Sequence, residues 1–304
     1  MPANLVLKEA LPRIVFDAPP LPPGRSVVLP GRGTMFVRDT GGPVDAPVVM
    51  LLHGLGATAS LNWFTAFPAL EDRYRVVAPD HRGHGRGIRS EASFTLEAAA
   101  DDVVALADAL GVRRFLAVGY SMGGPIAQLV WRRHPERISG LVMCATSYRF
   151  RESAREHAMF AALPALEHLQ RMLPDAAARR VVAQISRSYF ADTGYSEWAR
   201  QEVIRRDPRA VLQAAMALGH YSAADWVGEI DVPTAVLVHT RDQVVPPRRQ
   251  FELASSVTGA VTHFVGSDHF AVVRHPQRFV RTLVDAIDDV ASALRSSNSL
   301  RLAS

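Results

Sequence analysis

A serine stands between glycines in the run GYSMGG, which occupies residues 119–124. A short apolar run, 115–118, precedes it, and a helical pattern, 125–134, follows it. A serine on a very tight turn from a strand into a helix projects its hydroxyl above the sheet, and glycines two residues to either side remove side chains that would collide across the turn. This context predicts that Ser121 is a nucleophile.

A serine hydroxyl needs a base to take its proton and an acid to orient that base. His269 follows the apolar run 261–265, and Asp242 follows the apolar run 235–238. The carboxyl ends of parallel strands are where the functional groups of open sheets gather. We therefore expect Ser121, Asp242 and His269 to act as nucleophile, acid and base, in the chain order expected for a serine at such a turn.

Three polar residues close to these positions are expected to have other roles. His275 precedes Pro276 at the start of the last helix, which favours a structural role, and His239 ends a strand just before the acid. Asp268 is adjacent to the base in the chain, so its side chain should point away from His269 as a solvated loop residue.

The oxyanion of an acyl-transfer intermediate needs two hydrogen-bond donors. One is expected to be the backbone N–H of Met122, directly after the nucleophile. The loop 53–56, with the sequence HGLG, follows an early apolar run at 48–52. The N–H of Leu55 is our candidate for the second donor, and His53 is expected to brace the loop.

The elements that must position these residues alternate along the chain. Apolar runs at 48–52, 74–78, 115–118, 138–145, 235–238 and 261–265 are separated by helical patterns, among them 95–110, 125–134 and 276–294. Strands separated by helices predict an α/β fold with a mostly parallel sheet flanked by helices.

Four segments are expected from the distribution of prolines and apolar runs. Residues 1–30 form a proline-rich arm that should hold no regular helix or central strand for long and should lie extended on the surface or on the sheet edge. Residues 31–146 and 226–295 form the core, and 296–304 form a tail. Residues 147–225 hold no strand run, so they predict a small helical insertion divided by Pro164 and Pro174.

Composition excludes several classes of protein. The chain has 304 residues, of which 48% are apolar and 21% charged, as expected for a globular protein with a full core. It has no long apolar run for a membrane span and no signal-peptide pattern, which favours the cytoplasm. Cys144, the single cysteine, sits in a strand-like run and rules out an internal disulfide. A net charge of +4 with scattered arginines gives no nucleic-acid footprint, and no metal-ligand spacing appears, so no cofactor or metal is expected.

At this point the chain resembles an α/β-hydrolase of the lipase and esterase type, similar to bacterial esterases, monoglyceride lipases and enol-lactonases. The resemblance covers about residues 30–295 and rests on five features in the family's order: the 53–56 loop, the turn DHRGHG at 80–85, the 119–124 run, Asp242 and the loop 266–269. It implies the α/β-hydrolase fold and the triad, and it implies that the 80–85 turn is structural.

The resemblance also implies that the helical insertion is a cap over the serine. A cap excludes water and adds apolar wall to the site. The candidate wall residues, expected to contact the acyl chain, are Phe150, Phe160, Leu163, Leu166, Met172 and Leu173.

The function expected from these residues is hydrolysis of small to medium carboxylic esters through an acyl-enzyme, with a small-molecule ester as the partner. An enol-lactonase, a thioesterase or a carbon–carbon bond hydrolase would use the same triad. An arginine of the insertion facing a substrate carboxylate would favour the enol-lactonase or carbon–carbon hydrolase, with Arg149, Arg151 and Arg155 as candidates. A non-catalytic ligand-binding protein on this scaffold is the alternative of another class. The sequence leaves the oligomeric state open.

Overall fold

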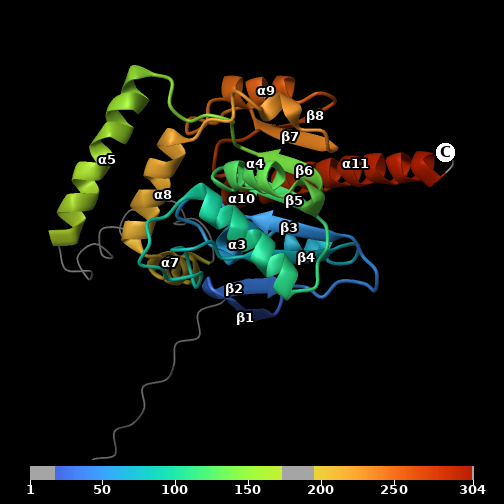
Figure 1. Cartoon of the computed structure of the whole chain (residues 1–304), viewed down its shortest axis with the longest axis horizontal. Helices are drawn as coiled ribbons and strands as arrows, with labels where there is room; N and C mark the ends of the chain where they lie inside the picture. Colours follow the sequence, from blue (N-terminus) through green and yellow to red (C-terminus); the bar gives the residue numbers. More distant parts are fainter. Residues whose placement is uncertain (1–17, 173–194, 303–304) are drawn as a thin grey trace, which may run out of the picture.

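An eight-stranded sheet forms the centre of the structure, a computed structural model that describes residues 18–172 and 195–302 (Figure 1). The strands lie in the order β1-β2-β4-β3-β5-β6-β7-β8. The first two pair antiparallel, and the other six run parallel to one another. Their bounds are β1 Gly24–Leu29, β2 Gly33–Asp39, β3 Val48–Leu52, β4 Arg75–Pro79, β5 Phe115–Tyr120, β6 Ile138–Cys144, β7 Thr234–His239 and β8 Val261–Val265.

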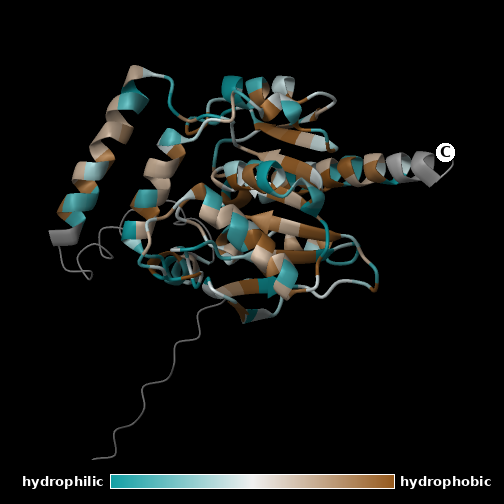
Figure 2. Ribbon diagram, in the orientation of Figure 1, coloured by the Kyte–Doolittle hydropathy of each residue, from teal (hydrophilic) through white to brown (hydrophobic). Residues whose placement is uncertain are grey.

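The six parallel strands confirm the predicted runs, and their burial explains why those runs were visible. Every residue of β5 and β7 is buried, so their apolar residues form continuous runs rather than alternating with polar ones. Figure 2 shows this hydrophobic centre clearly. Cys144 ends β6 as a buried free thiol, and burial raises its pKa.

The last part of the proline-rich arm is extended at the edge of the sheet, as expected. Residues 24–29 lie between prolines and form edge strand β1, in which Val27 and Leu29 are buried while their neighbours face out. An edge strand pairs on one side only, so flanking prolines do not prevent it. Residues 1–17 lie outside the described part of the chain.

Helices cover both faces of the sheet, and each face has its own apolar cluster. One cluster includes α3 (Leu96–Ala109), α4 (Gly123–Arg133) and α9 (Pro247–Ser256). The other includes α1 (Ala59–Trp63), α2 (Phe67–Leu70), α10 (Ala271–Arg274) and α11 (Pro276–Leu302). Short 3-10 turns stand at Pro135–Arg137 and Val227–Glu229.

The helix bounds follow from capping and from helix-breaking residues. The Thr95 hydroxyl caps α3 by accepting a hydrogen bond from the N–H of Ala98 at 3.0 Å. Helix α11 continues to Leu302, so residues 296–302 extend this helix rather than forming a separate tail. No glycine or proline follows Pro276, and nothing in the sequence therefore ends the helix earlier.

The insertion between β6 and β7 is helical, as predicted. It contains α5 (Ala154–Met172), α7 (Ser196–Ile204) and α8 (Pro208–His220), and α5 lies on the outside against α8 (Figure 1). Pro164 stands inside α5 and does not divide it. It is exposed, so the helix loses one hydrogen bond there without ending. Pro174 lies outside the described residues.

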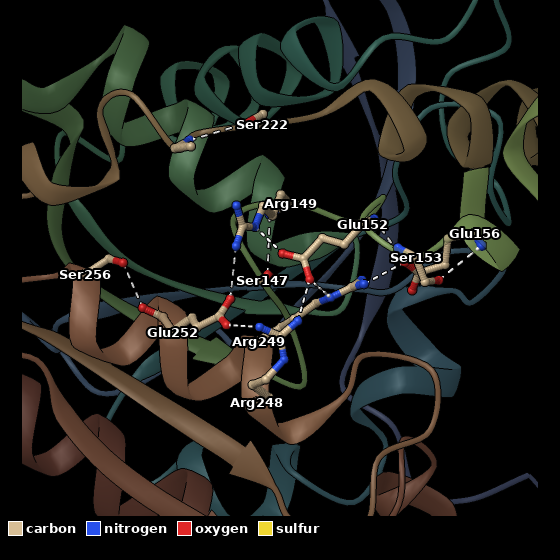
Figure 3. A network of polar contacts seen from close by, with 11 residues as sticks. Ser147, Arg149, Glu152, Ser153, Glu156, Ser222, Arg248, Arg249, Glu252 and Ser256 are labelled. Atoms are coloured by element: carbon tan, nitrogen blue, oxygen red, sulfur yellow. Dashed lines mark hydrogen bonds and ion pairs between the residues drawn. The ribbon is translucent and has the colours of Figure 1, made fainter.

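A cluster of ion pairs joins the start of the insertion to α9 (Figure 3). Arg249 on α9 is only 4% exposed and contacts Glu152 at 3.0 Å and Glu156 at 2.6 Å. Burial raises the pKa of Glu156, but Arg249 and two backbone N–H groups outweigh it and hold that pKa at about 2. An isolated antiparallel β-bridge pairs Arg149, near the start of the insertion, with Ser222, near its end. The insertion is therefore fixed to the core at its base.

Within the described residues, no helix combines the length and apolar character needed to cross a bilayer.

Candidate active site

Ser121 occupies a strained turn between β5 and α4. Its φ is 51°, in the left-handed region that side chains other than glycine seldom adopt. A Cβ on Gly119 would meet the carbonyl oxygen of Gly123 at 2.2 Å, and one on Gly123 would meet that of Leu52 at 2.1 Å. The turn is held by the N–H of Ser121, which donates to the carbonyl of Cys144 at 2.9 Å. The close approach predicted for the two glycines is confirmed.

Three side chains meet above the carboxyl ends of β5, β7 and β8. Ser121 Oγ lies 3.1 Å from His269 Nε2, and His269 Nδ1 lies 2.7 Å from Asp242 Oδ2. Ser121 and Asp242 are buried, and the imidazole of His269 is largely covered. Because parallel strands end at one edge of the sheet, residues separated by up to 148 positions come together here.

The Asp242 carboxylate receives hydrogen bonds on both oxygens. Oδ1 accepts from the backbone N–H groups of Val244 at 2.8 Å and Val245 at 2.9 Å. Oδ2 accepts from His269 and, at 3.1 Å, from the side-chain amide of Gln250 on α9. These four bonds define the orientation of a buried carboxylate, which in turn defines the tautomer and orientation of the imidazole.

The other two candidate histidines are occupied elsewhere. His275 Nδ1 lies 2.8 Å from the hydroxyl of Ser267. His239 is buried, its Nδ1 donates to the carbonyl of Asp268 at 3.0 Å, and burial lowers its pKa to about 4. Neither imidazole contacts the Ser121 hydroxyl, since His269 is the histidine that the structure places there.

Asp268 is more than the solvated loop residue that we expected. Its carboxylate accepts from the N–H of Phe270 at 2.9 Å and pairs with Arg274. It therefore closes the turn that carries His269 while its side chain is engaged away from the imidazole. Tyr120 holds the same turn from below, because its hydroxyl donates to the carbonyl of His269 at 2.7 Å.

The loop 53–56 is braced as predicted. His53 is buried, its Nδ1 donates to the carbonyl of Gly54 at 2.8 Å, and its Nε2 accepts from the N–H of His81 at 3.0 Å. Burial lowers the pKa of His53 to about 4. Asn62 accepts from the N–H of Gly54 at 3.0 Å. The loop is therefore rigid where it passes Ser121, and a Cβ on Gly54 would meet the Cβ of Ser121 at 3.3 Å.

The two backbone groups expected to hold an oxyanion are free of acceptors within the described residues. Neither the N–H of Leu55 nor that of Met122 donates a hydrogen bond to another described group. Leu55 lines the same cavity as Ser121, and Met122 follows Ser121 in the chain.

A cavity of about 270 Å³ opens above Ser121 and His269. Its apolar walls come from the core loops and from α7 of the insertion, and they consist of Leu55, Leu61, Val203, Phe270, Val272 and Val273. Asn62 and Arg206 add polar groups to the lining. The insertion therefore does cover the serine, with α7 as the helix next to it.

The wall residues expected from the sequence lie elsewhere, and this is a correction. Phe150 is buried in the apolar cluster on the α3 and α4 face of the sheet. Phe160 is partly buried and packs against the same cluster. A Cβ on Gly219 of α8 would meet the Phe160 ring at 2.4 Å, so that ring seats against α8. Leu163 is half-buried on α5, and Leu166 is 49% exposed. The side chain of Met172 and all of Leu173 fall outside the described residues. Helical spacing identified an apolar stripe on α5, of which Phe160 packs on α8 while Leu166 remains exposed.

The insertion arginines proposed from the sequence do not line the cavity either. Arg149 pairs with Glu152 and with Glu252, the latter at 3.3 Å, and Arg151 and Arg155 are exposed. Arg206, four residues beyond the buried Glu202, is the arginine that the structure places in the cavity. No sequence pattern distinguishes Arg206 from its neighbour Arg205 as a cavity residue. No pattern marks Gln250 as a partner of the acid either. Only the position of α7 and α9 in space identifies them.

Among the described residues, no group of three or more histidine, cysteine, aspartate or glutamate side chains is arranged to hold a metal ion.

Comparison with known proteins assigns the family. The family described as alpha/beta hydrolase fold matches residues 47–276, and the chain belongs to it. A 2-hydroxymuconate semialdehyde hydrolase of a Pseudomonas species is 27% identical over 282 residues, which cover 89% of this chain and 95% of the relative. Two solved structures share the fold. An enol-lactonase from Burkholderia xenovorans has a TM-score of 0.73 at 24% identity, covering 87% of this chain and all of the other. A thermophilic esterase from Thermogutta terrifontis has a TM-score of 0.71 at 24% identity, covering 88% and 99%.

Proposed function

We propose that the protein is a serine hydrolase that cleaves carboxylic esters of small to medium acyl groups through an acyl-enzyme. The observation that carries the proposal is the pair of hydrogen bonds from Ser121 to His269 at 3.1 Å and from His269 to Asp242 at 2.7 Å, at the wall of a cavity. A hydroxyl, an imidazole and a carboxylate in this relation can move one proton and form one covalent bond.

In the proposed reaction, His269 Nε2 takes the proton of Ser121 as its oxygen attacks the ester carbonyl carbon. The N–H groups of Leu55 and Met122 stabilise the oxyanion, since they have no other described acceptor. His269 then gives the proton to the departing alcohol, which leaves an acyl group on Ser121. Water attacks that acyl group as His269 takes its proton; the bond to Ser121 then breaks, His269 returns the proton to the serine oxygen, and the acid is released. Asp242 stabilises the imidazolium in both steps.

The second candidate is hydrolysis of a lactone or of a carbon–carbon bond next to a carbonyl. The relative at 27% identity is a 2-hydroxymuconate semialdehyde hydrolase, and one structural neighbour is an enol-lactonase. These names support the candidate at the level of chemistry, because the same nucleophile and base serve each reaction. A panel of an ester, an enol-lactone, an acyl thioester and a carbon–carbon substrate, compared by kcat/KM, decides between them.

A fluorophosphonate probe tests whether Ser121 is activated at all. We expect the wild type to be labelled and Ser121→Ala to be inert, with kcat lower by about a thousandfold or more. His269→Ala should be comparably severe, whereas His275→Ala should be mild because His275 contacts Ser267 instead. Labelling of Ser121→Ala, or a severe His275→Ala with a mild His269→Ala, would refute the assignment.

A further inference from the structure

The Ser121 cavity contains one arginine whose charge has no counter-charge among the described residues. Arg206 Nη1 donates to the carbonyl of Gly56 at 2.9 Å, and its Nε is buried without a partner. A guanidinium has five N–H donors, so most of its capacity is unused by the described protein. Burial lowers the pKa of Arg206 to about 10, which leaves it charged at neutral pH.

The surrounding backbone leaves room for this guanidinium and fixes its place. Gly56 has a φ of 70°, and a Cβ there would meet Arg206 Nη1 at 2.6 Å, so the absence of a side chain makes room for the charge. One helical turn earlier, the buried Glu202 accepts from the hydroxyl of Thr58 at 3.0 Å. Helix α7 and the segment directly after it are thereby bonded to the core at Thr58 and at Gly56.

The charged groups around Arg206 do not neutralise it. The described lining of the cavity includes no aspartate or glutamate, and Glu202 is engaged by Thr58 and by Arg86 at 3.8 Å. A half-buried charge without a partner is unfavourable unless a ligand supplies the opposite charge. Arginine is suited to that ligand because its planar fork matches a carboxylate.

We propose that Arg206 is the anion-binding residue of the Ser121 site, and that the substrate carries a carboxylate besides the bond that is cleaved. This inference rests on the proposed hydrolase function and names the substrate class. The carboxylate lies at the end of the cavity formed by Gly56 and α7, while the scissile carbonyl lies between Ser121 and the N–H groups of Leu55 and Met122.

The test compares charged and neutral esters of matched shape. For the acyl side, the pair is the mono-4-nitrophenyl ester of adipic acid and that of adipic acid monoamide. For the alcohol side, the pair is the acetyl ester of 3-hydroxybenzoate and that of 3-hydroxybenzamide. We expect the wild type to prefer the carboxylate in at least one pair by about ten- to a hundredfold in kcat/KM, as for a charge-assisted hydrogen bond.

Arg206→Met should lower kcat/KM for the charged ester by about ten- to a hundredfold more than for its neutral partner, which abolishes the preference, and Arg206→Lys should retain part of it. Arg205→Met is the matched control, because Arg205 is exposed, carries the same charge and lies outside the cavity lining. It should keep the preference. An equal loss on charged and neutral esters in Arg206→Met would mean that Arg206 only anchors α7, and it would overturn the proposal, as would a wild type without any preference.

Calorimetric binding of free adipate separates this proposal from the proposed function. If the wild type cleaves no ester and Ser121 is not labelled, the hydrolase function fails. Adipate binding that is lost in Arg206→Met and kept in Arg205→Met would then still support the anion site. Absent binding, or binding unchanged in Arg206→Met, would overturn it. If neutral esters are cleaved without preference, only the anion site fails.

Discussion

Gln250 and His269 donate hydrogen bonds to the same oxygen of the Asp242 carboxylate, at 3.1 Å and 2.7 Å. Gln250 is fully buried, and its amide also bonds the carbonyl of Val245 at 2.7 Å and the N–H of His239 at 2.9 Å. It therefore connects the end of β7 to the loop that carries the acid. We interpret Gln250 as a positioning residue for Asp242.

Gln250→Met removes these bonds with little change in side-chain volume. We expect kcat to fall by about tenfold, because Asp242 loses a donor and holds the imidazole less firmly, with KM nearly unchanged. Gln128→Met is the matched control, since Gln128 is also a buried glutamine, bonded to Ser147 and Tyr221 away from the triad. A similar fall in kcat for both variants would mean that Gln250 stabilises the fold and does not position Asp242.

The rate should rise with pH. A histidine base accepts the serine proton only when it is neutral, so kcat/KM should be low in acid and increase with pH. Burial lowers the pKa of His53 and His239 to about 4, so both are neutral above about pH 5 and cannot cause a rise there.

The pH profile of kcat/KM on a neutral ester checks this. His239→Asn is the control, because the asparagine amide can replace the donor of Nδ1 and cannot titrate. Its profile should keep the wild-type inflection. A rate that is flat from about pH 5 to 9, with chemistry limiting, would contradict a histidine base.

The length of acyl chain that the enzyme accepts should depend on α7 and not on α5. Val203 lines the cavity, so Val203→Phe should fill part of it and shorten the longest chain that is hydrolysed well. Each methylene that loses its contact costs roughly 0.8 kcal/mol, or about fourfold in kcat/KM.

Leu163→Phe is the matched change on α5, where the side chain is half-buried away from the cavity lining. It should leave the chain-length profile unchanged. A series of 4-nitrophenyl esters measures both variants. If Leu163→Phe alters the profile and Val203→Phe does not, the acyl chain contacts α5 and not α7.

Stability should fall as the pH drops from about 6.5 toward 4. Burial lowers the pKa of His84 to about 3, and those of His53 and His239 to about 4, from the ordinary histidine pKa of about 6.5. The unfolded chain therefore binds more protons than the folded one in this range, and the free energy of unfolding rises with pH. Above about pH 6.5 these groups add no further pH dependence.

His84→Asn checks the size of this effect. Its amide can replace the bond from Nδ1 to the carbonyl of Arg82, and it cannot titrate. Urea unfolding at pH 7 and pH 4.5 should show a smaller acid loss than in the wild type, by about 2 to 3 kcal/mol. The exposed His157→Asn should lose as much as the wild type. An acid loss that His84→Asn does not reduce would mean that His84 does not stay neutral in the folded state.

The sequence by itself determined the parallel strands, the turn at Ser121 and the order of Ser121, Asp242 and His269. These are local signals: a buried strand is an apolar run, and a tight strand-to-helix turn needs Gly119 and Gly123. The family match and the sheet topology confirm the fold class, and the contacts at 3.1 Å and 2.7 Å support the assignment of the three residues, which stays a prediction until tested.

Only the tertiary structure decided which residues of the insertion meet the cavity. An apolar stripe at helical spacing does not say which of its members a neighbour covers: Phe160 packs on Gly219 of α8, whereas Leu166 is exposed. Arg206 and Gln250 are single polar residues among many, and their significance depends on what lies across from them. Gly56, 150 positions away, accepts from Arg206, and that contact exists only once α7 is placed on the core.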